Sequence, residues 1–319
     1  MPAGTASAAR VLATTVTAYL ARRMLQAIAV VLLVTLIVFG LLQLGPGAAR
    51  AGVVGVGPAH QEFVLQYLGW LGQVLRGNLG VSTRLGEPVA TLLVASLPRT
   101  LILMGISTLL ALAVSIPLGL LQAVRRGGVA DNLVRALTVM FYGMPAFVLG
   151  NVLILIFGVH LHLFGAEAPQ AAGVGGILAD WRDLTLPVLT LALVTIAIFA
   201  RYMRSSAADT LEEEYVEAAR ARGAGERRIL ARHVLRNSLA PIVTLLGLSI
   251  PQILGGAVIV EALFNFPGVG WQIWEAAQAH DLPVILGFTL VIGIGAAVGS
   301  LLADIGYVIL DPRVRLTRP

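Results

Sequence analysis

The chain has 319 residues, of which 57% are hydrophobic and 12% are charged, and its mean hydropathy is +0.87. Soluble domains carry about 25% charged residues, so this composition excludes an ordinary soluble domain and indicates a polytopic membrane protein. All 22 basic residues are arginine, and without lysine the chain cannot form the GxxxxGKS/T loop that binds nucleotide phosphates. The absence of cysteine excludes disulfides and thiol chemistry.

The first predicted transmembrane helix is Met24–Leu44, a run of 21 residues without a charge. Such a run crosses about 30 Å of hydrocarbon, whereas the apolar part of a signal peptide is only about 7–15 residues long. Residues 1–23 before it are predicted to form an N-terminal cytoplasmic segment. Residues 45–97 after it are punctuated by Gly and Pro and contain no apolar run of spanning length, so they are predicted to form an external loop.

The second predicted helix, Leu101–Val124, carries a small residue at every fourth position along one stretch. A stripe of this kind lets the backbone of a neighbouring helix approach closely. Pro117 removes one backbone hydrogen bond and predicts a bend in this helix. The stripe consists of Ser107, Ala111, Ser115 and Gly119.

The third predicted helix lies within Leu133–Leu161 and is interrupted by Gly143-Met144-Pro145. Proline is tolerated in a spanning helix where neighbours or water satisfy the freed carbonyl. Two interpretations stay open: a packing kink, or a break that lines the pathway. His160 and His162 lie two residues apart and could begin a metal site, but the sequence offers no cysteine and no nearby third ligand. A non-ligand position at the membrane interface is the favoured interpretation.

Three further spans are predicted at Leu184–Tyr202, Leu239–Val260 and Pro283–Leu310, and a cytoplasmic tail at residues 311–319. The fold class is therefore an all-α polytopic membrane protein with six transmembrane helices, of which residues 98–310 contain the last five. Glu261 is an acid at the end of the fifth span. It is either a proton or ion site, as intramembrane acids often are, or a buried acid that hydrogen-bonds the external loop, which we favour.

The longest polar stretch is Met203–Ser238, which we call the elbow. Its sequence predicts two short helices joined at Gly223-Ala224-Gly225. One face of the first helix and an apolar patch on the second follow helical spacing. The face comprises Leu211, Tyr215, Ala218, Ala219 and Arg222, and the patch comprises Ile229, Leu230, His233 and Val234. A soluble partner can bind a helical segment that projects from a membrane and displace it.

The distribution of arginine predicts the orientation of the chain. Six spans place both ends on one side of the membrane, together with the eight arginines between Arg201 and Arg236. The opposite side holds only Arg50, Arg76, Arg84, Arg99 and Arg182. Because short cytoplasmic loops carry an excess of Lys and Arg, both termini and the elbow are predicted to lie in the cytoplasm.

Several motifs resemble those of ABC importer permeases. Glu217-Ala218-Ala219 followed by Gly223 is similar to the EAA–G motif of that family, and His233–Asn237 followed by Pro241 resembles the HALRN…P of its dipeptide/oligopeptide/nickel branch. Gly255–Gly270 resembles the family's GGAVVVExxFxxPGxG and is the most specific match. The resemblance covers nearly the whole chain, although Asn78 and Pro46-Gly47-Ala48-Ala49 depart from the family pattern.

The resemblance implies a type I ABC importer permease-like fold in a bacterial inner membrane, with the elbow serving as the coupling helix. It implies a pore subunit, not an enzyme, with no cofactor of its own. The implied partners are a related second permease subunit in a heterodimer, two ATPase subunits or domains that bind ATP and Mg, an external substrate-binding protein and membrane lipid, but no nucleic acid. Di- or oligopeptides are the expected cargo; nickel or another small solute is the alternative.

The resemblance also implies two sets of functional residues. The residues expected to contact the ATPase are Tyr215, Glu217, Ala218, Ala219, Arg222, Gly223, His233, Arg236 and Asn237. The candidates for the pathway or its gate are Met144, Pro145, Phe147, Pro251, Gly255, Gly256 and Glu261. No catalytic, cofactor-binding or metal-binding residue is expected in this chain.

Two other classes of protein fit the sequence less well. An ion-coupled secondary transporter needs paired intramembrane acids or broken helices in inverted repeats, whereas the acids here are isolated near helix ends. A membrane-embedded hydrolase needs a constellation such as HExxH or GxSxG, and the sequence contains neither.

Overall fold

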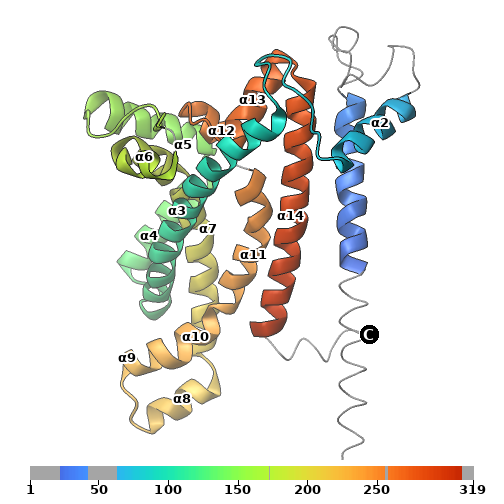
Figure 1. Cartoon of the computed structure of the whole chain (residues 1–319). Helices are drawn as coiled ribbons and strands as arrows, with labels where there is room; N and C mark the ends of the chain where they lie inside the picture. Colours follow the sequence, from blue (N-terminus) through green and yellow to red (C-terminus); the bar gives the residue numbers. More distant parts are fainter. Residues whose placement is uncertain (1–21, 42–62, 172, 256–257, 311–319) are drawn as a thin grey trace, which may run out of the picture. The chain divides into compact units, whose positions relative to one another are not determined.

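The structure is a computed structural model that describes residues 22–41, 63–171, 173–255 and 258–310. These residues are helical, apart from turns and one isolated antiparallel bridge between Val81 and Pro88 (Figure 1). After the first helix, Arg22–Leu41, the long elements are α2 (Phe63–Leu75), α3 (Val89–Val124), α4 (Val129–Gly143), α7 (Trp181–Leu211), α11 (Ala240–Gly255), α13 (Val269–Ala279) and α14 (Leu282–Leu310). The shorter elements are α5 (Ala146–Leu153), η2 (Ile154–His160), α6 (Gly173–Ala179), α8 (Glu214–Ala221), α9 (Glu226–Arg228), η3 (Ile229–Val234), α10 (Leu235–Ser238) and α12 (Val258–Leu263).

The chain divides into two compact units. Among the described residues, the first unit comprises 22–41, 63–92 and 276–302, and the second comprises 93–275 and 303–310. The first unit is held by an aromatic core in which Phe39 and Trp70 are fully buried. The Tyr67 hydroxyl donates to the Leu32 carbonyl at 3.1 Å, which fastens α2 to the first helix. Residues 63–75 are thus a helix, although the sequence analysis predicted a loop over 45–97.

A buried carboxylate organises the rest of the first unit. Asp281, just before α14, accepts hydrogen bonds from the Ser82 hydroxyl at 2.5 Å and from the backbone N–H groups of Thr83 and Arg84 at 3.2 Å each. Its side chain is almost fully buried. Burial of a carboxylate is tolerated only when its oxygens are satisfied, so this cluster fixes the turn before α3 against the start of α14.

The long helices agree in part with the six predicted spans. Four described helices are long and apolar enough to cross a membrane: Arg22–Leu41, α3, α7 and the part of α14 from Leu282 to Leu301. The third predicted span is a pair of helices, Asp131–Gly143 and Ala146–His160, bent by 109°. The fifth corresponds to α11, of 16 residues, with α12 beyond it. The helix count is therefore roughly that predicted.

Two spans are longer than predicted. Helix α3 begins at Val89 instead of Leu101 and has 36 residues, and α7 runs from Trp181 to Leu211 instead of ending at Tyr202. The polar residues that follow Tyr202 are predicted from the sequence to begin the elbow, but the structure places them in α7. They remain helical because Met203, Ala207 and Thr210 lie on one buried face and continue the 3.6-residue period of α7.

The predicted small-residue stripe of α3 is confirmed. Its four residues are all buried, and at Gly119 the backbones of α3 and α7 touch. A Cβ atom on Gly119 would lie 2.6 Å from Met203 Cβ, 2.8 Å from the Ala200 carbonyl oxygen and 2.9 Å from the Arg204 nitrogen. Two of these three atoms belong to the backbone and cannot rotate away. Only glycine therefore permits this crossing.

Gly119→Ala is expected to destabilise the protein by about 1–3 kcal/mol, the usual cost of forcing extra atoms into a packed core. Gly105→Ala, in the same helix, is the matched control because nothing lies within 4 Å of its added Cβ. Thermal unfolding of both variants in one detergent measures the difference. Equal midpoints for the two variants would show that the α3–α7 crossing is not as tight as described.

Candidate functional site

The elbow lies at one end of the second unit, away from the end formed by α5, α6 and α12 (Figure 1). Because α7 continues to Leu211, the elbow in the structure is limited to residues 212–238, and Leu211 belongs to α7 and not, as predicted, to the next helix. Glu213 is the N-cap residue of α8, and Glu214 and Glu217 lie in its first turn. Acidic residues at this position are favoured by the positive end of the helix dipole.

Helix α8 ends in a fully hydrogen-bonded cap. Gly223 has φ +81°, and its N–H donates to the Arg220 carbonyl at 2.9 Å, while the Ala224 N–H donates to the Ala219 carbonyl at 3.1 Å. This pair of bonds is the Schellman motif, which glycine serves because it adopts positive φ without a Cβ penalty. The predicted joint at Gly223 is confirmed, but it is a defined turn and not a loose hinge.

An apolar core beneath the elbow holds its two arms together. Val216 and Ala219 of α8 are buried against Ile229 and Val234 of η3, and the same cluster includes Met203 of α7. The Ser238 hydroxyl donates to Thr210 Oγ1 at 3.1 Å, so it joins α10 to α7. The predicted place of Val234 in the apolar patch is confirmed. These contacts make the elbow an extension of α7 with a fixed orientation.

The outer face of the elbow carries most of the residues predicted to contact an ATPase. Tyr215 is 40% exposed, and its hydroxyl accepts a hydrogen bond from Asn237 Nδ2 at 2.7 Å. The His233 ring lies 6.4 Å from the Tyr215 ring and is half-buried. The other exposed members of the set are Glu217, Ala218, Arg222, Gly223 and Arg236.

Ala219 differs from the rest of that set because it is 3% exposed and points into the elbow core. In this structure it therefore supports the outer face from beneath and offers no surface of its own. The sequence analysis placed it on one face with Ala218, but neighbouring positions of a helix are about 100° apart. Val216 and Ala219 are both buried, so the face of α8 that carries them is the one packed into the elbow core.

One ion pair crosses the joint between the arms. Arg220 Nε lies 2.8 Å from Glu226 Oε1, and this guanidinium holds the pKa of the Glu226 carboxyl below its ordinary value. Both side chains are largely exposed, at 42% and 61%. An exposed pair of this kind contributes little to stability, so the Schellman motif and the apolar core, not this pair, set the angle of the elbow.

Met144 and Pro145 form the break between α4 and α5. Pro145 is the N-cap residue of α5, with φ −56° and ψ 137°, so the chain leaves the helical conformation here. The bend of 109° is sharper than a packing kink and favours the interpretation of a true break. Met144 packs against the core of the second unit, whereas Phe147 is 45% exposed.

The other gate candidates fall in a less described part of the chain. Pro251 and Gly255 lie within α11, and at these two positions the structure describes the backbone but not the side chain. Gly256 lies outside the described residues. Proline at position 251 leaves α11 helical on both sides. Their predicted role in the pathway stays a prediction.

Glu261 is a fully buried anchor in the structure. Its Oε1 accepts a hydrogen bond from the Thr100 hydroxyl at 2.7 Å, and its Oε2 accepts from the backbone N–H groups of Gly270 and Trp271 at 2.7 and 3.1 Å. The same Thr100 oxygen accepts from the Val269 N–H at 2.8 Å. These bonds tie α3, α12 and the start of α13 together and favour the anchoring interpretation over a proton site.

A second set of backbone contacts extends this anchored turn. The Ala168 N–H donates to the Phe264 carbonyl at 2.8 Å, and Gln170 Nε2 donates to the Asn265 carbonyl at 2.7 Å. The loop after η2 is thereby attached to the turn after α12. Thr100 and Gln170 were not singled out from the sequence, because neither belongs to a periodic pattern or a motif.

His160 and His162 show no arrangement typical of a metal site. His160 Nδ1 lies 2.7 Å from the Leu155 carbonyl oxygen, and His162 has φ +51°. Within the described ranges, no group of three His, Cys, Asp or Glu side chains is placed to hold a metal ion.

The long apolar helices indicate a membrane protein, and the comparison with solved structures identifies the fold. The chain shares its fold with the permease in a structure of the inward-facing MetNI methionine ABC transporter, with a TM-score of 0.55 and 18% identity over 70% of this chain and 99% of the other. The fold is that of a type I ABC importer permease. The family model for the binding-protein-dependent transport system inner membrane component matches residues 115–316, and the chain belongs to this family.

Curated relatives extend the likeness over nearly the whole chain. The oligopeptide transport system permease protein AppB of Bacillus subtilis (strain 168) is 36% identical, over 93% of this chain and 99% of the relative. The dipeptide transport system permease protein DppB of Escherichia coli (strain K12) is 31% identical, over 88% and 94%. The nickel import system permease protein NikB of Staphylococcus aureus (strain bovine RF122 / ET3-1) is 30% identical, over 92% and 90%.

Glu261→Ala is expected to lower the free energy of unfolding by about 1–3 kcal/mol for each buried donor that it leaves unpaired. Thermal unfolding measures this loss, and Glu167→Ala is the control because the side chain of that acid is exposed. If Glu261 were a proton site instead, Glu261→Gln would change the pH dependence of uptake while leaving the unfolding temperature near that of the unmodified protein.

Proposed function

We propose that this permease is one of two related pore subunits in an ATP-driven importer, and that the elbow is where a separate ATPase subunit binds. The observation that carries the proposal is the rigid, exposed outer face of the elbow around Tyr215 and Ala218, fixed on the end of α7. A surface that is both accessible and firmly attached to a long helix can transmit a displacement along that helix.

The ATPase is a separate polypeptide in this proposal because the chain has no lysine for a phosphate-binding loop. ATP and Mg bind there, and closure of two such subunits pushes the elbow. The Schellman motif at Gly223 keeps the two arms of the elbow at a constant angle, so the push reaches α7 and α10 together. The cavity then changes from inward-facing to outward-facing.

The orientation proposed for the chain follows from its arginines. Both termini and the elbow face the cytoplasm, where the arginine-rich segments belong by the positive-inside rule. The end of the second unit that carries Glu261 and Thr100 then faces outward, where an external binding protein delivers the substrate. The mate of this chain is a related but distinct permease subunit, as the resemblance to the peptide-transport branch implies.

Di- or oligopeptides are the proposed cargo. Two relatives with the similarities given above are named for oligopeptide and dipeptide transport. Nickel import is the second candidate, since NikB is similar over 92% of this chain. The external binding protein selects the cargo in this proposal, so the ligand that co-purifies with that protein distinguishes the two candidates.

Gly223→Val tests the role of the elbow. No atom lies within 4 Å of an added Cβ at this position, so the penalty identified for the substitution is the backbone strain at φ +81°. Peptide uptake is expected to fall at least about tenfold, while the variant still inserts into the membrane at normal abundance. Uptake in proteoliposomes with the co-expressed ATPase measures the effect.

Gly223→Asn is the matched control because asparagine tolerates the left-handed conformation better than other residues do. This variant is expected to keep most of the uptake. Normal uptake by Gly223→Val, at equal abundance, would contradict the proposed coupling. Active transport by the purified chain without any ATPase would instead support a secondary transporter.

A further inference from the structure

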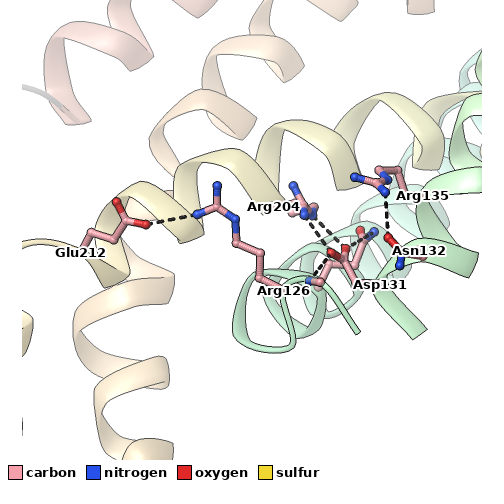
Figure 2. A network of polar contacts seen from close by, with 8 residues as sticks. Arg126, Asp131, Asn132, Arg135, Arg204 and Glu212 are labelled. Carbon is pink, nitrogen blue, oxygen red and sulfur yellow. Dashed lines mark hydrogen bonds and ion pairs between the residues drawn. The ribbon is translucent and has the colours of Figure 1, made fainter. Parts of the chain in front are cut away.

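A buried ion pair joins the start of α4 to α7. The Asp131 side chain is fully buried, and its two oxygens accept hydrogen bonds from Arg204 Nε at 2.9 Å and Arg204 Nη2 at 2.8 Å. The Gly127 N–H donates to Oδ2 at 3.0 Å, and Gln122 Nε2 approaches Oδ1 at 3.4 Å. Figure 2 shows Arg204 directed from α7 at this carboxylate.

The geometry of this pair restricts movement in several directions. A bidentate guanidinium–carboxylate contact fixes distance and orientation together, which a single hydrogen bond does not do. The same carboxylate receives donors from the end of α3 and from the α3–α4 turn. Three consecutive parts of the chain are therefore held at one buried charge, which is costly to expose unpaired.

A second close contact involves the same residue of α7. Gly119, three residues before Gln122, brings the α3 backbone against Ala200 and the nitrogen of Arg204 itself. The apolar cluster beneath the elbow also includes Ala123 of α3. Backbone contact at Gly119 and charge pairing at Asp131 thus both involve Arg204 of α7, and we call this place the joint; closely packed joints of this kind do not deform continuously.

The joint lies close to the elbow along a continuous helix. Arg204 and Leu211 are both in α7, and α8 starts at Glu214, after a short turn. Val216 and Ala219 pack into the same cluster as Met203, the neighbour of Arg204. An outer ion pair, Arg126 Nη1 to Glu212 Oε1 at 3.1 Å, also connects the turn to this region (Figure 2), but its side chains are 63% and 74% exposed.

We propose that Asp131 and Arg204 are positioning residues of the transport cycle, which make the α3–α4 turn, α7 and the elbow helix α8 move as one rigid body. This inference rests on the proposed function, because the displacement comes from an ATPase bound to the elbow. It assigns the buried pair, and not the exposed Arg126–Glu212 pair, as the element that carries the displacement from α8 to α3 and α4.

Distances between spin labels test this proposal on the assembled complex. The chain has no cysteine, so Val129→Cys at the start of α4 and Ala221→Cys at the end of α8 can be labelled without removing native thiols. Val129 is 86% exposed and Ala221 is also exposed. Pulsed electron–electron double resonance measures the distance between them in nanodiscs, without nucleotide and with a non-hydrolysable ATP analogue.

The expected distance distribution is the same in the two nucleotide states for the otherwise unmodified chain. Asp131→Asn, which removes the charge at nearly constant shape, is expected to broaden the distribution and to make its centre depend on nucleotide. Peptide uptake per ATP hydrolysed is expected to fall about tenfold in the same variant. Glu212→Gln, the control in the exposed pair, is expected to change neither quantity.

Two outcomes overturn the inference: a nucleotide-dependent distance when the pair is intact, or an unchanged distribution and coupling ratio in Asp131→Asn. If Asp131→Asn fails to assemble, Arg204→Lys replaces it, because lysine keeps the charge but loses the bidentate contact. Failure of the proposed function has a different signature. No ATPase would then co-purify with any form of the chain, labelled or unlabelled, whereas the inference about the joint concerns complexes that do assemble.

Discussion

The close packing of α3 on α7 is the constraint on which the second unit depends. Gly119 allows the two backbones to touch, and the stripe of small residues before it stays buried along α3. In a membrane, helices gain no hydrophobic free energy by leaving lipid for one another, so close van der Waals contact at small residues has to hold them together. Because α7 is held in this way, it can support the elbow at its far end.

Buried carboxylates perform a related task at three places. Glu261 joins α12 and α13 to Thr100, Asp281 joins the start of α14 to the turn before α3, and Asp131 joins α4 to α7. In the first two cases the donors are hydroxyl and backbone N–H groups, and only Asp131 has a bidentate arginine. Each of these acids is costly to bury unless its partners are in place, so each specifies one arrangement of the chain segments around it.

The structure combines rigid helices with interrupted ones, an arrangement that suits a protein that changes conformation. The elbow has a complete cap and its own core, and α7 continues unbroken for 31 residues. By contrast, the third predicted span is broken at Met144-Pro145 and continues beyond α5 as π-helical turns at Ile154–His160. Irregular helical segments of this kind are frequent at functional sites because they are easier to rearrange than a regular helix. These features occur in a chain that belongs to the family of binding-protein-dependent transport system inner membrane components.

Much of this protein was determined by its sequence alone. Long apolar runs must span a membrane as helices, the absence of lysine removes the phosphate-binding loop, and the polar elbow with Gly223 had to form a capped turn. These properties depend on local composition and spacing, and the motifs at Glu217–Gly223 and Gly255–Gly270 indicated the family. The tertiary structure decided which face of α8 is hidden, how far α7 extends, and that Asp131 meets Arg204. Those outcomes depend on pairs of residues far apart in the chain, and no local pattern records which distant partner satisfies a buried group.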